Sequence, residues 1–196
     1  MGSPLTMTLA NIYMFEWEQP LIEYQKSQNE LYGRYIDDVF MTTNSLSKMN
    51  IQLNQMGKKD PNIKITWSLG ATMEFLDVCV TNENGKLKTS VYHKPAAEPY
   101  ILPFLSEHPR HIHRNTIKGA LFRAARLCSN VEDFDYERLH IELTLLLNGY
   151  PLKFITYHFK QFFQQHHVPS LLSDQPQDQI IYEQFHKKIL VQLSRR

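Results

Sequence analysis

The change in hydrophobic pattern near residue 130 is the feature that most constrains the fold of this 196-residue chain. Before that point, short apolar runs that alternate with turns predict β-strands with a few helices between them. After it, apolar residues recur at helical spacing almost throughout. The pattern predicts an α+β fold, an antiparallel strand region with helices followed by an all-helical bundle, in one domain or two small ones.

Charge and composition exclude several classes of protein. The chain has 21 Lys and Arg against 20 Asp and Glu, a formal charge of +1, which excludes a uniformly basic nucleic-acid glove and an acidic tail. The longest apolar run, Ile12 to Phe15, is far shorter than the roughly 20 residues of a membrane span. Cys79 and Cys128 lack CxxC spacing and predict reduced core thiols. We therefore expect an intracellular protein in a reducing compartment with no membrane partner, and the nucleus and cytoplasm both stay open.

The first predicted helix begins at Ser3 and Pro4, a capping side chain followed by a residue whose fixed φ suits the first helical position. Pro20 is expected to end or kink this helix. Its apolar positions recur at helical spacing, at Leu5, Leu9, Ile12 and Tyr13.

Residues 31–43 predict a β-hairpin that carries two carboxylates at its tip, Asp37 and Asp38. Two carboxylates at one bend repel each other unless a cation neutralises them. The arrangement suits Mg²⁺, which takes oxygen ligands, and a pair of such ions can drive phosphoryl transfer. A solvated turn with no ligand explains the same residues equally simply.

The remaining elements follow from periodicity and turn residues. A tight turn at Asn84-Gly85 predicts a hairpin between residues 75–81 and 86–93, and residues 62–68 alternate as in a strand. Helical spacing predicts helices over residues 45–57, 115–129, 132–147, Pro151 to about His166, and 178–194.

Several short motifs resemble the boxes of reverse transcriptases. Tyr35-Ile36-Asp37-Asp38 resembles their YxDD box, and Gly2-Ser3-Pro4-Leu5-Thr6 with the Leu9–Tyr13 run resembles the box that precedes it. Later segments, among them Phe75–Val78 and Val91–Pro95, resemble the palm and primer-grip hairpin of retroelement enzymes, especially Penelope-like ones. The resemblance covers residues 1 to about 130. It implies a partial polymerase palm over residues 1–95 and a thumb-like helical region over 96–196.

The resemblance also implies roles for particular residues. It makes Asp37 and Asp38 the catalytic ligands of two Mg²⁺ ions, with Mn²⁺ as a substitute, in RNA-directed DNA synthesis. It places the nucleotide and template near Gly2, Ser3, Pro4 and Tyr35, with an RNA template and DNA primer, or their hybrid duplex, as partners. Relatives need a further aspartate upstream, but Asp37 is the first aspartate here. We therefore expect the chain to be inactive alone unless an upstream polypeptide supplies the rest of the palm and fingers.

A basic segment between Lys86 and Arg126 predicts contact with phosphates. Eight Lys and Arg against two Glu leave +6 in 41 residues. A solvated helix face explains these charges about as well without the resemblance. With it, the residues expected to hold the primer backbone are Tyr92, Lys94, Arg114, Lys118 and Arg123.

Three further features stay open at this stage. His108, His111 and His113 give weak support for zinc and are expected to be polar residues entering a helix. The aromatic run over residues 154–163 is expected to pack in a core rather than form a stacking platform. A rival to the polymerase interpretation is a non-catalytic nucleic-acid-binding protein, in which the helices from Asn115 onward form a helix-turn-helix module.

Overall fold

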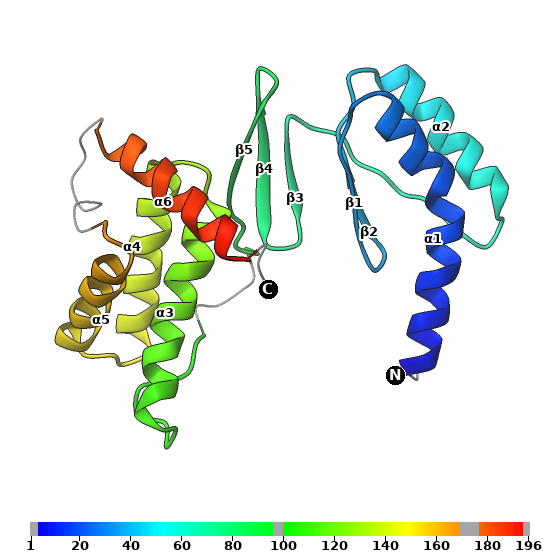
Figure 1. The fold of residues 1–196 in the computed structure, drawn as a ribbon. Helices are drawn as coiled ribbons and strands as arrows, with labels where there is room; N and C mark the ends of the chain where they lie inside the picture. The colour runs from blue at the N-terminus through cyan, green and yellow to red at the C-terminus, as the bar shows by residue number, and fades with distance from the viewer. Residues whose placement is uncertain (1–3, 96–99, 169–176, 194–196) are drawn as a thin grey trace. The chain divides into compact units, whose positions relative to one another are not determined.

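The structure is a computed structural model that describes residues 4–95, 100–168 and 177–193 (Figure 1). The described residues form six α-helices and five β-strands, the strands pairing into two small antiparallel sheets. The predicted α+β class is therefore confirmed. The chain divides into two compact units, which we call unit 1 (Met1–Leu69) and unit 2 (Gly70–Arg196). None of the helices described here is long and apolar enough to cross a membrane.

Unit 1 packs a two-stranded hairpin and two helices around a small core. Its elements are α1 (Pro4–Ser27), β1 (Tyr32–Tyr35), β2 (Asp38–Met41) and α2 (Leu46–Lys59). Met49, Leu53 and Met56 recur at helical spacing, so one face of α2 is apolar and buried. That face meets Trp17 and Leu21 of α1.

Helix α1 does not end at Pro20, which was one of the two outcomes expected there, but continues to Ser27. Proline has no N–H, so the Glu16 carbonyl four residues earlier loses its helical partner. Lys59 of α2 supplies donors there, since its Nζ lies 3.4 Å from the Glu16 oxygen and 3.0 Å from the Trp17 oxygen. The helix is thus extended through the proline by a contact from outside it.

The strand predicted over residues 62–68 is absent from the described structure, where this segment pairs with no other strand. Its alternation is nevertheless reflected in packing, because Ile63 and Ile65 are half-buried against the unit 1 core. Trp67, the next residue on that face, is exposed. Alternation describes which way side chains point, and a strand also needs a neighbour for its backbone.

The sheet of unit 2 has three antiparallel strands in the order β3 (Thr72–Phe75), β4 (Val78–Glu83) and β5 (Lys86–Val91). Asn84 and Gly85 turn between β4 and β5 with φ of 55° and 90°, which confirms the predicted tight hairpin. The strand predicted over residues 75–81 is interrupted by a second turn at Leu76 and Asp77.

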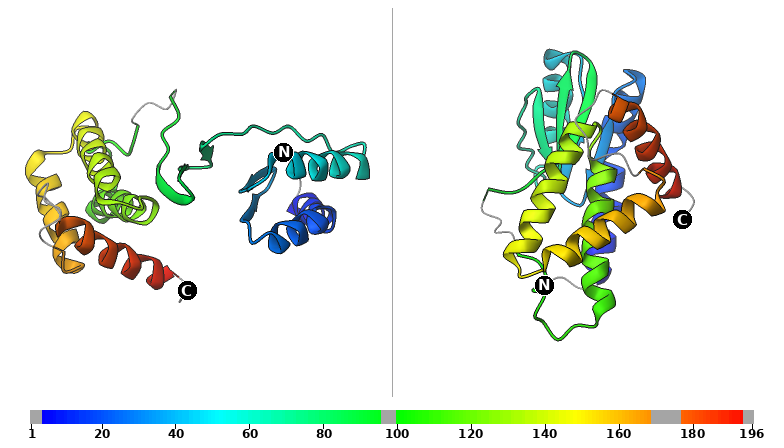
Figure 2. Two further views of the ribbon diagram at one scale, coloured as in Figure 1. Left: turned by 90° about the horizontal axis from the view of Figure 1, so that it is seen from above. Right: turned by 90° about the vertical axis from the view of Figure 1, so that its left-hand side faces the viewer.

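Four helices complete unit 2: α3 (Arg110–Leu127), α4 (Val131–Leu147), α5 (Leu152–Gln165) and α6 (Gln177–Leu193). Helices α4 to α6 lie within one or two residues of their predicted bounds, and α3 begins five residues earlier than predicted. Figure 2 shows them as a bundle in which α3 contacts each of the other three. The predicted apolar face of α3 is buried at Ile117, Leu121, Ala124 and Cys128.

The aromatic run of α5 packs in this core as predicted, with Phe159, Phe162 and Phe163 buried and only Tyr157 well exposed.

Neither cysteine forms a disulfide. Burial raises the pKa of the Cys128 thiol to about 12, so this thiol stays protonated at neutral pH.

The boundary between the compact units, at Leu69 and Gly70, differs from the predicted division at residue 95. Strand β5 packs on the helices that follow it: Ser129 N donates to the Thr89 oxygen at 2.8 Å, and Lys88 pairs with Asp133 at 3.2 Å. These contacts join the three-stranded sheet to the helical bundle. The assignment of residues 1–95 to a polymerase palm stays a prediction.

Candidate functional site

The two predicted aspartates lie at the end of the β1–β2 hairpin. Tyr35 pairs with Asp38, which leaves Ile36 and Asp37 as the turn. We call Ile36, Asp37 and Asp38 the hairpin tip. All three are exposed, and no ion pair within the described parts of the chain neutralises either carboxylate. The predicted hairpin with carboxylates at its tip is therefore what the backbone forms.

Ile36 adopts a left-handed conformation with φ of 55°. A β-branched residue rarely takes this conformation, because its Cβ substituents crowd the backbone. Such a residue persists only where its surroundings over-determine it, at a cost of about 1–3 kcal/mol. The contacts that hold this turn are therefore part of the site.

Arg34 holds the hairpin tip. Its guanidinium donates from Nη1 to the backbone carbonyl oxygen of Ile36 at 2.8 Å and to Asn11 Oδ1 of α1 at 3.2 Å. Its Nε lies 2.6 Å from Glu18 Oε2 but is not directed at it, so we treat this contact as an ion pair rather than a hydrogen bond. One side chain thus joins the turn to two positions on α1.

Glu18 anchors this arrangement although it is a carboxylate only 3% exposed. Tyr32 donates its hydroxyl to the same Glu18 oxygen at 2.6 Å. Burial, with the hydrogen bond to Glu18 second, raises the pKa of Tyr32 well above its ordinary value. Sequence reasoning missed Arg34, Glu18 and Asn11, and the only available signal was that Arg34 directly precedes the YxDD-like motif.

Of the other residues predicted near the nucleotide, Pro4 and Tyr35 lie within the described residues. Tyr35 is exposed beside the hairpin tip. Pro4 is the first residue of α1, whereas Gly2 and Ser3 lie outside the described residues. Among the described residues no three His, Cys, Asp or Glu side chains gather as a metal site. Asp37 and Asp38 could contribute carboxylate oxygens to a Mg²⁺ ion, and further ligands would have to come from elsewhere.

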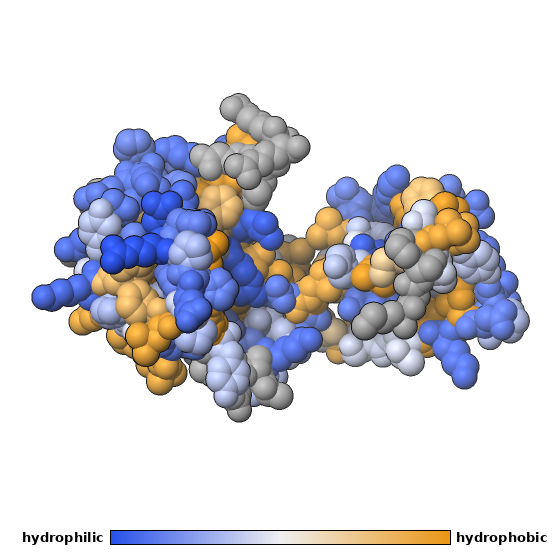
Figure 3. Space-filling model, turned by 90° about the horizontal axis from the view of Figure 1, so that it is seen from below, coloured by the Kyte–Doolittle hydropathy of each residue, from blue (hydrophilic) through white to orange (hydrophobic). Residues whose placement is uncertain are grey.

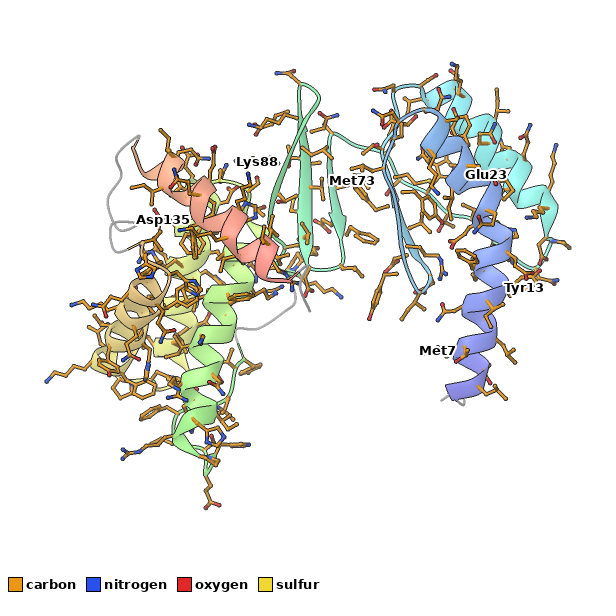
Figure 4. The ribbon with its side chains drawn as sticks, viewed as in Figure 1. Met7, Tyr13, Glu23, Met73, Lys88 and Asp135 are labelled. Atoms are coloured by element: carbon orange, nitrogen blue, oxygen red, sulfur yellow. The ribbon has the colours of Figure 1, made fainter. Side chains whose placement is uncertain are left out.

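Apolar side chains of α1 are exposed toward its N-terminal end. Figure 4 marks Met7 and Tyr13 on this part of the helix, and Figure 3 shows exposed apolar side chains (orange) on the face that it draws. Tyr13 donates its hydroxyl to Asp60. The exposed apolar side chains of this part of α1 are Leu5, Met7, Leu9, Ile12 and Phe15.

A second candidate site lies on α3 in unit 2. This helix carries five basic residues and no acidic one. Arg114, Lys118 and Arg126 are exposed, and no ion pair within the described ranges neutralises them. We call Arg114, Asn115, Lys118 and Arg126 the basic face of α3.

The remaining predicted phosphate-binding residues differ in their surroundings. Arg123 Nη2 lies 3.2 Å from Asp77 Oδ2, and the backbone N–H of Tyr92 donates to the backbone carbonyl oxygen of Asp77 at 2.9 Å. All three residues therefore meet at the β3–β4 turn. The side chain of Tyr92 also bonds Glu74, which raises the pKa of Tyr92. Lys94 is exposed beyond β5. The structure thus brings Tyr92 and Arg123 together and leaves Arg114 and Lys118 on α3.

The acidic residues of α4 are largely used inside the protein. Glu137, 5% exposed, lies with its Oε2 2.6 Å from His93 Nε2. Asp133 pairs with Lys88 and Asp135 with Arg138, each at 3.2 Å. The backbone N–H of Asp133 also donates to Oδ1 of the N-cap residue Asn130 at 2.9 Å.

The same region contains a cavity of about 260 Å³ that sequence reasoning missed. His93, Arg123, Glu137 and His140 supply polar groups to its lining. The rings of His93 and His140 lie 4.2 Å apart between centroids. The only signal in the sequence was the spacing of Glu137 and His140 on one helical face.

The three histidines near the start of α3 do not form a metal site. His113 is buried and hydrogen-bonds the Tyr150 hydroxyl at 3.1 Å. His108 and His111 are exposed, and His108 lies 3.2 Å from Ser106 Oγ. The expectation of polar residues entering a helix holds for His108 and His111, whereas His113 belongs to the core.

Two histidines, one in α5 and one at its C-terminal end, have lowered pKa values. Burial lowers the pKa of His158, and the positive charge of Arg114 lowers it further. Burial likewise lowers the pKa of His166, with contributions from Lys118 and His167.

Comparison with known protein families gives a match within unit 2. The family model described as an animal helix-turn-helix domain matches residues 100–160, which contain α3, α4 and most of α5. No curated protein and no solved structure matches the chain significantly.

Proposed function

We propose that the chain binds nucleic acid through the basic face of α3. The observation that carries this proposal is the exposed position of Arg114, Lys118 and Arg126, three of the five cations of a helix without acidic residues. Cations of this kind bind a phosphate backbone by releasing its counterions. The match of residues 100–160 to a helix-turn-helix family supports the same partner.

Charge also distinguishes the two helices of the proposed module. Helix α4, which follows the turn, has five acidic residues and only Arg138 as a cation. Three of these acids pair within the protein, but Arg138 also pairs with Asp135, so α4 offers a phosphate backbone no unpaired Lys or Arg, whereas α3 offers several. We therefore assign the phosphate contacts to α3, the first helix of the pair.

Binding of fluorescently labelled duplexes at several salt concentrations tests this function. Three phosphate contacts predict a slope of about −2.7 for log K against log salt, so affinity falls about 40-fold between 50 and 200 mM salt. An RNA–DNA hybrid and a DNA duplex of equal length are measured in parallel. Because phosphate contacts do not read the bases, we expect a salt slope of this size for both duplexes.

The variant Arg114→Ala/Lys118→Ala removes two of these contacts and lowers the slope to about −0.9. The matched control is Lys187→Ala/Lys188→Ala, which removes two exposed cations of α6 and keeps the slope unchanged. A flat salt response of the wild-type chain, or equal slopes for both variants, contradicts the proposal.

A second proposal concerns unit 1, which we infer to be part of the palm of an RNA-directed DNA polymerase. It is supported by the exposed position of Asp37 and Asp38 and by the contact of Arg34 with Asn11. That contact joins the two segments that resemble successive polymerase boxes. The aspartates would hold Mg²⁺ or Mn²⁺ for two-metal nucleotidyl transfer on an RNA template and DNA primer.

The polymerase proposal requires a second polypeptide that completes the set of metal ligands. Only two carboxylates lie at the hairpin tip, and metal catalysis depends on a complete set of ligands. Exposed apolar residues of α1, such as Leu9 and Phe15, support a covering polypeptide as partner. Such a polypeptide would supply a third acidic ligand together with the rest of the palm.

Primer extension with Mg²⁺ or Mn²⁺ tests this second function. We expect no product from the chain alone and extension when a polypeptide bearing the upstream palm strand and its aspartate is added. Asp37→Asn should abolish that extension, whereas the control Glu83→Gln, which removes an exposed carboxylate next to the β4–β5 turn, should leave it unchanged. Extension that survives Asp37→Asn would exclude Asp37 as a catalytic ligand.

A further inference from the structure

Gly119 lies in the middle of α3, on the exposed side of the helix beside the basic face. It follows Asn115 by four residues and precedes Phe122 by three, so the three share one side of the helix. Lys118 is its immediate neighbour, and Arg126 lies two turns further along the same side. Glycine is thus placed among the cations that are proposed to contact phosphates.

Nothing within the described structure requires a glycine at this position. A Cβ added to Gly119 would meet no atom within 4 Å, and its φ is not in the left-handed region. Glycine in the interior of an exposed helix is less stable than alanine, because it loses more backbone freedom on folding. The sequence therefore carries a cost in helix stability at the one exposed position of α3 where a bare backbone lies beside cations.

We propose that Gly119 is the point at which the sugar-phosphate backbone of a nucleic-acid duplex approaches the backbone of α3. This inference rests on the proposed function and adds a residue that contacts the ligand without a side chain. Glycine permits such close approach because no Cβ separates the helix from its ligand. Lys118 and Arg126 then flank the approaching strand and neutralise its phosphates.

Charge selects a nucleic acid over a protein as the occupant. The exposed side of α3 carries Arg114, Lys118 and Arg126 and no acidic residue. An apolar or basic protein surface packed on Gly119 would leave these cations without partners. A polyanion satisfies the glycine and the cations together.

The test compares Gly119→Ala and Gly119→Leu with the wild-type chain. At 0.15 M salt, moving one phosphate out of reach of its cation weakens binding about fivefold, since the salt slope per phosphate is about 0.9. We expect about a fivefold loss of affinity for the alanine variant, which displaces one phosphate, and about 30-fold for the leucine variant, which displaces two. Both losses are measured with the DNA duplex and with the RNA–DNA hybrid.

The control is Gly57→Ala, which adds the same methyl group to another open, exposed helical glycine, in α2. It should leave affinity unchanged. Circular dichroism of Gly119→Ala should show an equal or higher melting temperature than the wild type, which separates a defect in binding from a defect in folding.

The outcomes distinguish this inference from the function on which it rests. If the wild-type chain binds neither duplex with a salt-dependent affinity, the proposed function fails. If the wild type binds and Gly119→Leu binds within twofold of it, the function stands and the close approach at Gly119 is excluded. If the glycine variants instead dissolve a self-associated species seen by sedimentation while duplex affinity stays unchanged, a second copy of the chain is the occupant and the inference is wrong.

Discussion

Replacing Arg34 by methionine should destabilise unit 1 by about 3 kcal/mol. The Glu18 carboxylate, which is only 3% exposed, would lose its charged partner and keep only the Tyr32 hydroxyl as a donor. The Ile36 carbonyl at the turn would lose its hydrogen bond from Arg34. Breaking a buried ion pair by removing one partner costs about 3–5 kcal/mol. We take the lower value, because the Arg34 Nε is not aligned with Glu18 and the arginine is itself 14% exposed.

Urea unfolding followed by tryptophan fluorescence measures this loss. Both tryptophans of the chain, Trp17 and Trp67, lie in unit 1, and Trp17 is buried in its core. The signal therefore reports unit 1 while unit 2 contributes none. A lower midpoint at constant slope on urea would represent a loss of stability rather than a change in the exposed surface.

Two further variants make this prediction refutable. Glu18→Gln/Arg34→Met removes both charges and should recover about 1–2 kcal/mol of the loss, because no buried charge is left unpaired. Lys48→Met, at an exposed position of α2, should stay within about 0.5 kcal/mol of the wild type. An exposed ion pair contributes up to about 1 kcal/mol. A smaller loss for Arg34→Met would refute the conclusion that Arg34 holds the hairpin tip against α1.

Two other predictions concern unit 2. Phe134 is fully buried, with its ring centroid 5.1 Å from that of Tyr182, so Phe134→Ala should cost about 3–5 kcal/mol in helix unfolding measured by circular dichroism, and a loss below about 1 kcal/mol would contradict this packing. The pKa values of His158 and His166 are lowered in the folded state. The unfolded chain therefore binds more protons, and the melting temperature should fall as pH drops from neutrality through the lowered folded values. A double His→Gln variant at both positions should flatten this decline, and an unchanged decline would assign it to other groups.

Local patterns predicted the parts of the fold that depend on neighbouring residues. The Asn84-Gly85 turn and the buried stripe of α3 through Ile117 followed directly from turn chemistry and helical spacing. The failures each depend on a residue distant in sequence. Helix α1 continues past Pro20, where Lys59 donates to the free Glu16 carbonyl, and the alternating segment near Ile63 pairs with no strand within the described parts of the chain.

The candidate sites show the same division. The sequence placed Asp37 and Asp38 at a hairpin tip, because short-range alternation and turn residues determine a hairpin. It could not show that Glu18 and Asn11 would meet Arg34, since these contacts span more than 15 residues. It also gave Arg123 the same weight as Lys118, although Asp77 pairs with Arg123 in the folded chain.

Comparison of the two hairpin turns identifies what is particular to the first one. Ile36 and Leu76 have nearly equal φ of 55° and 56°, and an aspartate follows each of them. Backbone strain at the turn is therefore shared and does not by itself indicate function. In the second turn Arg123 neutralises Asp77, whereas in the first turn Asp37 is followed by another aspartate, and the described residues supply neither with an ion pair. Two adjacent carboxylates without an ion-pair partner repel each other, so the first turn keeps a negative charge that the Mg²⁺ proposed above would neutralise, whereas the second turn does not.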